Sequence, residues 1–176
     1  MASDRSLRFS HSFVISCGTV TVDLVRSKLL LIHWHATGEY FLPKGRKDVG
    51  ETLERTALHG TFEETGYKVE LLPLTIQTRA TGGSDTKAKN TSVTEPVAVQ
   101  QRVTKEGILK IIFWFAAKGS LTEKREKGSQ QEGEDFDAVW VRFEQASNIL
   151  SFDDDKQIAE EVLMHVIDEA AEEKKH

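Results

Sequence analysis

The apolar residues of this chain recur at two different periods, and the two periods separate expected strands from expected helices. Residues 12–24 and 28–35 are rich in β-branched and apolar side chains with a short break between them, which predicts an antiparallel pair of strands. Residues 109–117 are the most apolar stretch of the chain and are predicted to be a buried strand. Two further strands are expected, at residues 69–79 and 138–142.

A helix is predicted over residues 52–65, because Thr52 can cap its N-terminus and Gly66 stands where a left-handed residue would end it. Four apolar residues form pairs at helical spacing and are expected to face the core: Leu53 with Ala57, and Leu58 with Phe62.

A second, longer helix is predicted over residues 154–172, where apolar residues repeat at intervals of three and four. The repeat runs through Ile158, Ala159, Val162, Leu163, Val166, Ile167 and Ala170. The segments 80–107 and 119–137 are polar and show no sustained period, so both are expected to be long loops.

Length and composition indicate one ordinary globular domain spanning residues 1–176. The chain is 39% apolar and 29% charged, which is enough apolar material to form a core without disulfides. The formal net charge of -5 argues against nonspecific binding to nucleic acid.

Cys17 is the only cysteine of the chain, which excludes an intrachain disulfide and predicts a small buried apolar group. The sequence has neither the apolar stretch of a signal peptide nor a run of membrane-spanning length, so a cytoplasmic location is expected, with the nucleus as a further possibility.

The residues that carry chemistry gather around the first predicted helix. Gly45, Glu51, Glu63, Glu64 and Gly66 have the spacing of a loop, a helix and a second loop that hold a divalent cation against a diphosphate. Water attacks a diphosphate slowly until a cation neutralises its charge, and Mg²⁺ or Mn²⁺ accepts carboxylate oxygens as ligands. The simpler interpretation is that these glutamates form only the solvated face of an amphipathic helix.

Residues 43–67, called the box segment below, resemble the sequence box of the Nudix hydrolases, G-x5-E-x7-R-E-U-x-E-E-x-G-U, where U is bulky and aliphatic. The resemblance implies an α/β fold, a Nudix-type α/β/α sandwich around a mixed β-sheet. It also implies that Glu51, Glu63 and Glu64 are catalytic, and that these carboxylates bind Mg²⁺ or Mn²⁺ together with the main-chain carbonyl of Lys44.

The box segment departs from the family pattern at His59 and Gly60, which stand where the family has Arg and Glu. In the family, the Arg orients the Glu at the position of Glu63, and the missing Glu is a metal ligand. Histidine cannot make the bidentate contact of arginine. Glycine inside a helix costs about 1 kcal/mol relative to alanine, so replacing Gly60 is expected to stabilise the helix.

Basic residues beside the acidic ones could bind the phosphates of a substrate. Lys44 and Arg46 are the main candidates, and Pro43-Lys44-Gly45 looks like the variant found in dinucleoside polyphosphate and diphosphoinositol polyphosphate hydrolases. The long loop could contribute Arg79, Lys87, Lys89, Arg102 and Lys105. A further acidic residue could come from Glu132, Glu134, Asp135 or Asp137.

The three tryptophans, Trp34, Trp114 and Trp140, are expected in the core, with base stacking as the alternative for Trp34. His33 and His35 share a strand face but lack a third ligand, so they make a weak metal site.

The sequence therefore predicts metal-dependent hydrolysis of a pyrophosphate linkage in a small-molecule polyphosphate, attenuated by the loss of Arg and Glu. The alternative is a catalytically inactive protein of the same fold that binds a ligand or regulates. RNA binding is disfavoured by the acidic charge.

Overall fold

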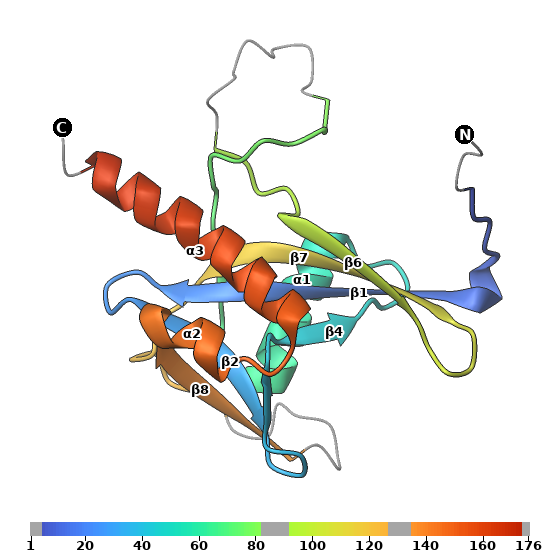
Figure 1. Ribbon diagram of the computed structural model, residues 1–176, viewed down its shortest axis with the longest axis horizontal. Coiled ribbons are helices and arrows are strands. Elements are labelled where there is room, and N and C mark those ends of the chain that lie inside the picture. Colours follow the sequence, from blue (N-terminus) through green and yellow to red (C-terminus); the bar gives the residue numbers. More distant parts are fainter. Residues whose placement is uncertain (1–4, 82–91, 127–134, 174–176) are drawn as a thin grey trace.

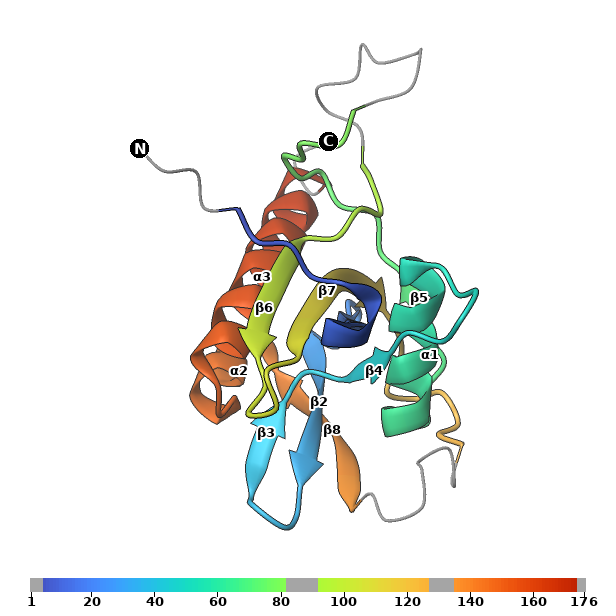
Figure 2. The ribbon, with the colours of Figure 1, turned by 90° about the vertical axis from the view of Figure 1, so that its right-hand side faces the viewer.

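The computed structural model describes residues 5–81, 92–126 and 135–173, and shows one mixed sheet between helices (Figure 1). Helix α1 covers one face of the sheet, while α2 and α3 lie against the other (Figure 2). The expected α/β class, a Nudix-type sandwich around a mixed sheet, is confirmed.

The centre of the sheet is β1 (Phe13–Asp23), which follows the short 3-10 helix η1 (Ser10–Ser12). On one side β1 runs parallel to β7 (Leu109–Lys118), in a register from Phe13 opposite Leu109 to Val22 opposite Lys118. On its other side, the end of β1 pairs antiparallel with β2 (Lys28–Trp34), as the sequence predicts.

Strand β1 shares one edge between two partners. Its end pairs with β2, which is flanked by β3 (Glu39–Phe41) and β8 (Phe136–Arg142). Its beginning pairs instead with β4 (Lys44–Arg46), the strand that opens the box segment. Residues 44–46 were not expected to be a strand, because three residues are too few to show a period. This pairing fixes the start of the box segment on the central strand.

The sequence prediction is partly wrong for residues 69–79 and for residues 80–107. Only β5 (Glu70–Leu71) forms a strand in the first region, followed by an isolated bridge between Leu74 and Val93. The expected loop contains β6 (Ala98–Val103), which pairs antiparallel with β7. Its residues are mostly exposed, and its apolar residues do not alternate with polar ones, so the strand lacks an apolar signal. The rest of that loop, 82–91, lies outside the described residues, as does 127–134 of the second expected loop.

Helix α1 (Leu53–Thr65) begins and ends as predicted. The Thr52 hydroxyl accepts a hydrogen bond from the backbone N–H of Arg55 at 3.2 Å, and Gly66 has a left-handed backbone with φ 75°. The expected core face is partly wrong, because Leu58 and Phe62 are only partly buried. The buried face consists of small and hydroxyl-bearing residues: Thr56, Ala57, Gly60, Thr61 and Thr65. Small side chains let α1 approach the sheet closely.

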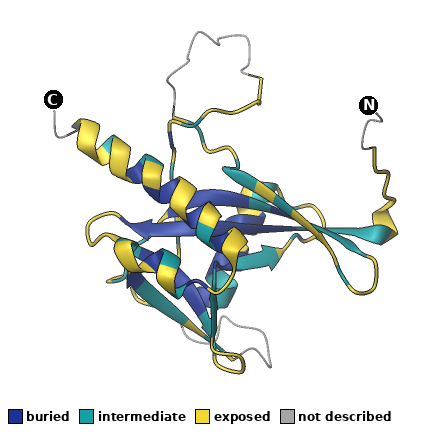
Figure 3. Cartoon of the chain, viewed as in Figure 1, coloured by how far each residue is buried: buried dark blue, intermediate teal, exposed yellow. Residues whose placement is uncertain are grey.

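Helices α2 (Phe143–Ile149) and α3 (Asp153–Glu173) cover the opposite face. The buried side of α3 supplies Ile158, Ala159, Val162, Leu163 and Val166 to the main core, and its other side is exposed (Figure 3). Ile167 continues the apolar repeat of the predicted helix but is 54% exposed. The reason is that the last part of α3 extends past the sheet (Figure 1).

Two predictions about the core concern Cys17 and the tryptophans. Cys17 is fully buried, and this burial raises its pKa to about 11, which fits the predicted small apolar group. Trp114 is a core residue at 1% exposure, as expected, whereas Trp34 and Trp140 are only partly buried. Among the described residues, no helix combines the length and the apolar character needed to cross a membrane.

Candidate functional site

The box segment is held together by a direct backbone contact between β4 and α1. A Cβ atom placed on Gly60 would lie 2.4 Å from the backbone N of Gly45 and 2.6 Å from its Cα. Both atoms belong to a paired strand, so they cannot rotate away as a side chain could. The expectation that replacing Gly60 stabilises the helix is therefore wrong, because the steric conflict outweighs helix propensity.

A buried chain of hydroxyl groups fixes α1 on the central strand. The Thr61 hydroxyl donates to the carbonyl of Ala57 at 2.8 Å, so at its 2.7 Å contact with Thr19 it must accept. Thr19 in turn accepts from Thr21 at 2.8 Å. Every hydroxyl in this chain has a partner, which satisfies the polar groups that burial would otherwise penalise.

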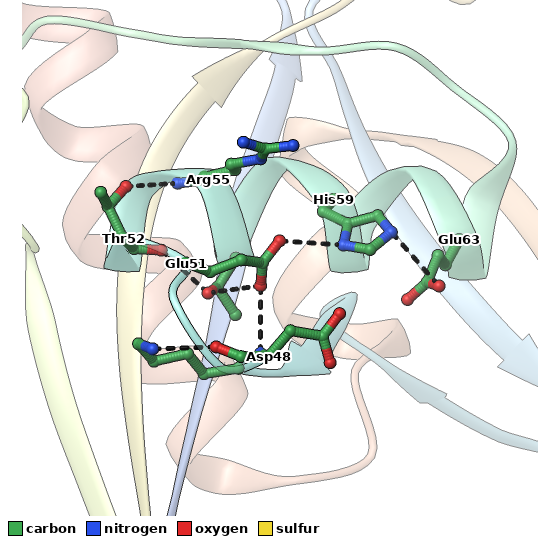
Figure 4. Close-up of polar contacts among 8 residues, drawn as sticks. Asp48, Glu51, Thr52, Arg55, His59 and Glu63 are labelled. Atoms are coloured by element: carbon green, nitrogen blue, oxygen red, sulfur yellow. Dashed lines mark hydrogen bonds and ion pairs between the residues drawn. The ribbon is translucent and has the colours of Figure 1, made fainter.

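Three side chains of the box segment form a line along the exposed side of α1 (Figure 4). His59 Nδ1 lies 3.1 Å from a carboxylate oxygen of Glu51, and His59 Nε2 lies 3.3 Å from one of Glu63. The resemblance implies that an arginine at position 59 would contact Glu63. His59 makes this contact through a single nitrogen, and it also contacts Glu51.

Glu51 is the most constrained of these carboxylates. It accepts hydrogen bonds from the backbone N–H of Asp48 at 3.1 Å and from the Thr56 hydroxyl at 3.0 Å. Burial opposes ionisation, but these hydrogen bonds, together with His59, outweigh it and hold the pKa of Glu51 below its ordinary value. Glu51 is therefore a fixed carboxylate that is ionised at neutral pH.

Asp48, Glu51 and His59 form the acidic cluster, whose possible ligand atoms all lie within 4.8 Å of one another. These residues line a cavity of ≈ 460 Å³ together with Val49, Gly50 and Arg55. Two carboxylates and an imidazole suit a divalent cation. Sequence reasoning missed Asp48, which belongs to no fixed position of the box, and treated His59 only as a lost arginine.

Glu64 faces β4. Its carboxylate accepts a hydrogen bond from the backbone N–H of Lys44 at 2.8 Å, so positions 60 and 64 share the face of α1 toward β4, as predicted. The Lys44 ammonium lies 4.9 Å from the centre of the Phe41 ring. The structure thus brings Glu51 and Glu63 together through His59, and Glu64 together with Lys44.

The remaining basic candidates lie on several different elements. Arg46 is exposed at the end of β4, and Arg102 lies on β6. Arg79 and Lys105 are exposed, the latter in the turn between β6 and β7. Lys87 and Lys89 lie outside the described residues.

The candidates for an additional acid are directed elsewhere or are not described. Asp137 lies 2.8 Å from His35 Nε2, and the Asp135 carbonyl accepts from the backbone N–H of His35 at 3.3 Å. Glu132 and Glu134 lie outside the described residues. His33 stacks on Tyr40 with the ring centres 4.3 Å apart.

Trp34 packs edge-on against Phe136 at 6.0 Å. It therefore has an aromatic partner within the fold.

Comparison with known proteins agrees with this arrangement. A hydrolase of the NUDIX family from Clostridium perfringens has a TM-score of 0.58 at 18% identity, covering 88% of this chain and 97% of its own. A C. elegans Ap4A hydrolase in a binary complex has a TM-score of 0.58 at 16% identity, covering 86% and 96%. At these identities the likeness concerns the fold alone. The family model of the NUDIX domain matches residues 17–165, so the chain belongs to the Nudix family.

Proposed function

We propose that this protein hydrolyses a pyrophosphate linkage in a small-molecule polyphosphate, slowly and with a divalent cation. The observation that carries the proposal is the acidic cluster, which lies in the Nudix box segment beside the lysine of Pro43-Lys44-Gly45. The substrate classes that fit the box are nucleoside diphosphate-linked compounds, dinucleoside polyphosphates and diphosphoinositol polyphosphates. The C. elegans Ap4A hydrolase of similar fold supports the second class.

The residues present fit a divalent cation, although their set differs from that of the family. Asp48, Glu51 and His59 would hold it, with Glu63 beside them on α1. Glu64 and the main-chain carbonyl of Lys44 remain predicted ligands. When bound, the cation neutralises phosphate charge and lowers the pKa of a bound water. An imidazole nitrogen favours Mn²⁺ over Mg²⁺, which prefers oxygen.

The chain's own residues have separable tasks in this proposal. Glu51 supplies a fixed negative charge, because its pKa is lowered by three hydrogen-bond partners. His59 orients Glu51 and Glu63 by contacting both. Lys44 and Arg46 on β4 bind phosphate oxygens. Position 60 supplies no carboxylate, and the packing against Gly45 has no space for one, so turnover is expected to be slow.

The second candidate function is a binding or regulatory protein without turnover. The close contact between Gly45 and Gly60 favours it, because a family ligand position is used here for packing. The two functions differ in whether product forms.

The test measures release of phosphate or nucleotide from a panel containing diadenosine tetraphosphate and a diphosphoinositol polyphosphate, with Mn²⁺ or Mg²⁺. We expect slow release that Mn²⁺ supports better, and that Glu51→Gln abolishes. Glu54→Gln is the matched control, since Glu54 is an exposed acid in the first turn of the same helix. No release from any substrate, or equal loss in both variants, would replace this proposal by the binding function.

A further inference from the structure

Four cationic side chains of three different strands lie on one face of the sheet, and two of them are the β4 residues proposed above to bind phosphate. They are Lys44 and Arg46 of β4, Arg102 of β6 and Lys110 of β7, and we call them the basic cluster. In the sheet, β4 and β7 pair with opposite edges of β1, and β6 pairs with the outer edge of β7 (Figure 1). The sequence analysis did not consider Lys110.

The register of the strands places the four on the same face. Lys44 and Arg46 pair with Gly18 and Ser16 of β1, while Lys110 pairs with Val14 of β1. These β1 positions alternate by two, so they share a face. Arg102 is the direct cross-strand partner of Lys110 and joins the same face. Helix α3 packs on this same face farther along the strands, against Ile112 and Trp114.

Lys110 is partly buried within this cluster. Burial, together with repulsion from Lys44, Arg102 and Arg46, lowers its pKa to about 8, while Glu64 acts in the opposite direction. Like charges directly opposite each other in a sheet are destabilising. The repulsion between these cations therefore destabilises the protein without a ligand, and a bound anion would relieve it.

Neighbouring acids offset part of this repulsion. Asp155 interacts electrostatically with Lys44 and Arg102, and Glu64 interacts with Lys110. At the start of α3, Asp154 accepts a hydrogen bond from Gln100 at 2.7 Å, and Asp155 accepts from the backbone N–H of Leu42 at 2.9 Å. Glu64 accepts from the backbone of Lys44.

We propose that the basic cluster is a binding site for a chain of three or more linked phosphoryl groups. Neighbouring strands lie about 4.8 Å apart, so the backbones of β4 and β6, with β1 and β7 between them, lie about 14 Å apart. A polyphosphate chain offers charged oxygens along its length to cations from several strands, whereas a single phosphate offers them at one point. The inference rests on the proposed function for the class of substrate, and assigns Lys110 as a residue that selects for phosphate number.

The test is calorimetric titration with inorganic tripolyphosphate at low salt and pH 7, in EDTA so that neither metal nor hydrolysis contributes. Lys110→Met is expected to weaken binding about 10- to 100-fold, the usual range for one charge-assisted hydrogen bond. Lys118→Met is the matched control on the same strand, because Lys118 is exposed and pairs with Glu70 outside the cluster. It should bind within about twofold of the wild type, since screened surface charges contribute little.

A pH series with Lys110→Arg separates binding from a packing role. Wild-type affinity is expected to fall between pH 7 and pH 9.5, because a neutral amine must take up a proton to bind the anion. Lys110→Arg keeps its charge over this range, so it should bind at pH 7 and lose much less affinity at pH 9.5.

Equal binding by wild type and Lys110→Met would overturn the proposal, as would an equal loss in Lys118→Met or an unchanged pH dependence in Lys110→Arg. The outcome is independent of the hydrolysis assay. Tripolyphosphate could bind to a protein that hydrolyses nothing, and hydrolysis could occur without a contribution from Lys110.

Discussion

Replacing Gly60 by alanine tests whether the contact between β4 and α1 governs the box segment. Alanine is favoured over glycine inside a helix by about 1 kcal/mol, so helix propensity alone predicts a more stable protein. The structure predicts the opposite, because the new Cβ would lie 2.4 Å from the backbone N of Gly45 and 3.1 Å from the carbonyl carbon of Lys44.

The magnitude follows from two opposing effects. Forcing one extra carbon into a packed interior costs about 1–3 kcal/mol, and contact with strand backbone on two residues places this site at the upper end. Subtracting the gain in propensity leaves a net loss of about 1–2 kcal/mol in the free energy of unfolding. For a chain of this size the thermal midpoint should fall by about 2–8 °C.

Thermal and urea unfolding of the metal-free protein provide the measurement. Arg55 offers the control, because it is exposed on the same helix. The difference between Arg55→Ala and Arg55→Gly reports the propensity difference without the steric contribution. If Gly60→Ala stabilises the protein by as much as that difference, the close contact does not exist in solution and the reasoning fails.

Three further predictions address the rest of the site. Mn²⁺ should raise the thermal midpoint more than Mg²⁺ in the wild type, and His59→Ala should remove that preference; equal effects of both ions on the wild type would exclude His59 as a ligand. Glu51→Gln should lower stability at pH 7, and its deficit should shrink in thermal scans as the pH falls below 4.5, because the stability from a lowered folded-state pKa is lost as the pH falls through that pKa; a constant deficit would mean that the charge is irrelevant. Thr61→Val should lose about 1–3 kcal/mol of unfolding free energy by leaving the Thr19 hydroxyl without its acceptor, whereas Thr61→Ser should retain most of it.

The parts of the fold that were predictable depend on local signals. The ends of α1 follow from Thr52 and Gly66, whose capping interactions need only the adjacent residues. The strand β6 was not predictable, because an edge strand with exposed polar residues such as Gln101 has no apolar alternation. The buried face of α1 was misjudged because apolarity marked Phe62, whereas contact with Gly45 requires small residues.

The candidate site was predictable only where the box fixes the spacing. Glu51, Glu63 and Glu64 stand at family positions of the box; in the structure Glu51 and Glu63 contact His59, and Glu64 contacts the backbone of Lys44. Asp48 and Lys110 come close to the other site residues only in the folded protein, so the sequence spacing did not indicate them. Asp48 approaches His59 because the loop after β4 turns back toward α1, and Lys110 approaches Arg46 only through the pairing of β1 with β7.

The parallel pairing of β1 with β7 has a consequence for the order in which the molecule folds. Phe13 pairs with Leu109, and the whole box segment lies in the intervening stretch of chain. Bringing the ends of so long a stretch together lowers the chain entropy before the contacts between the strands can stabilise the closed state. This slows folding. Because α1 packs on both β1 and β7, its complete packing surface forms only after these two strands have paired. The box segment is therefore expected to acquire its final geometry late in folding, after the distant halves of the sheet have joined.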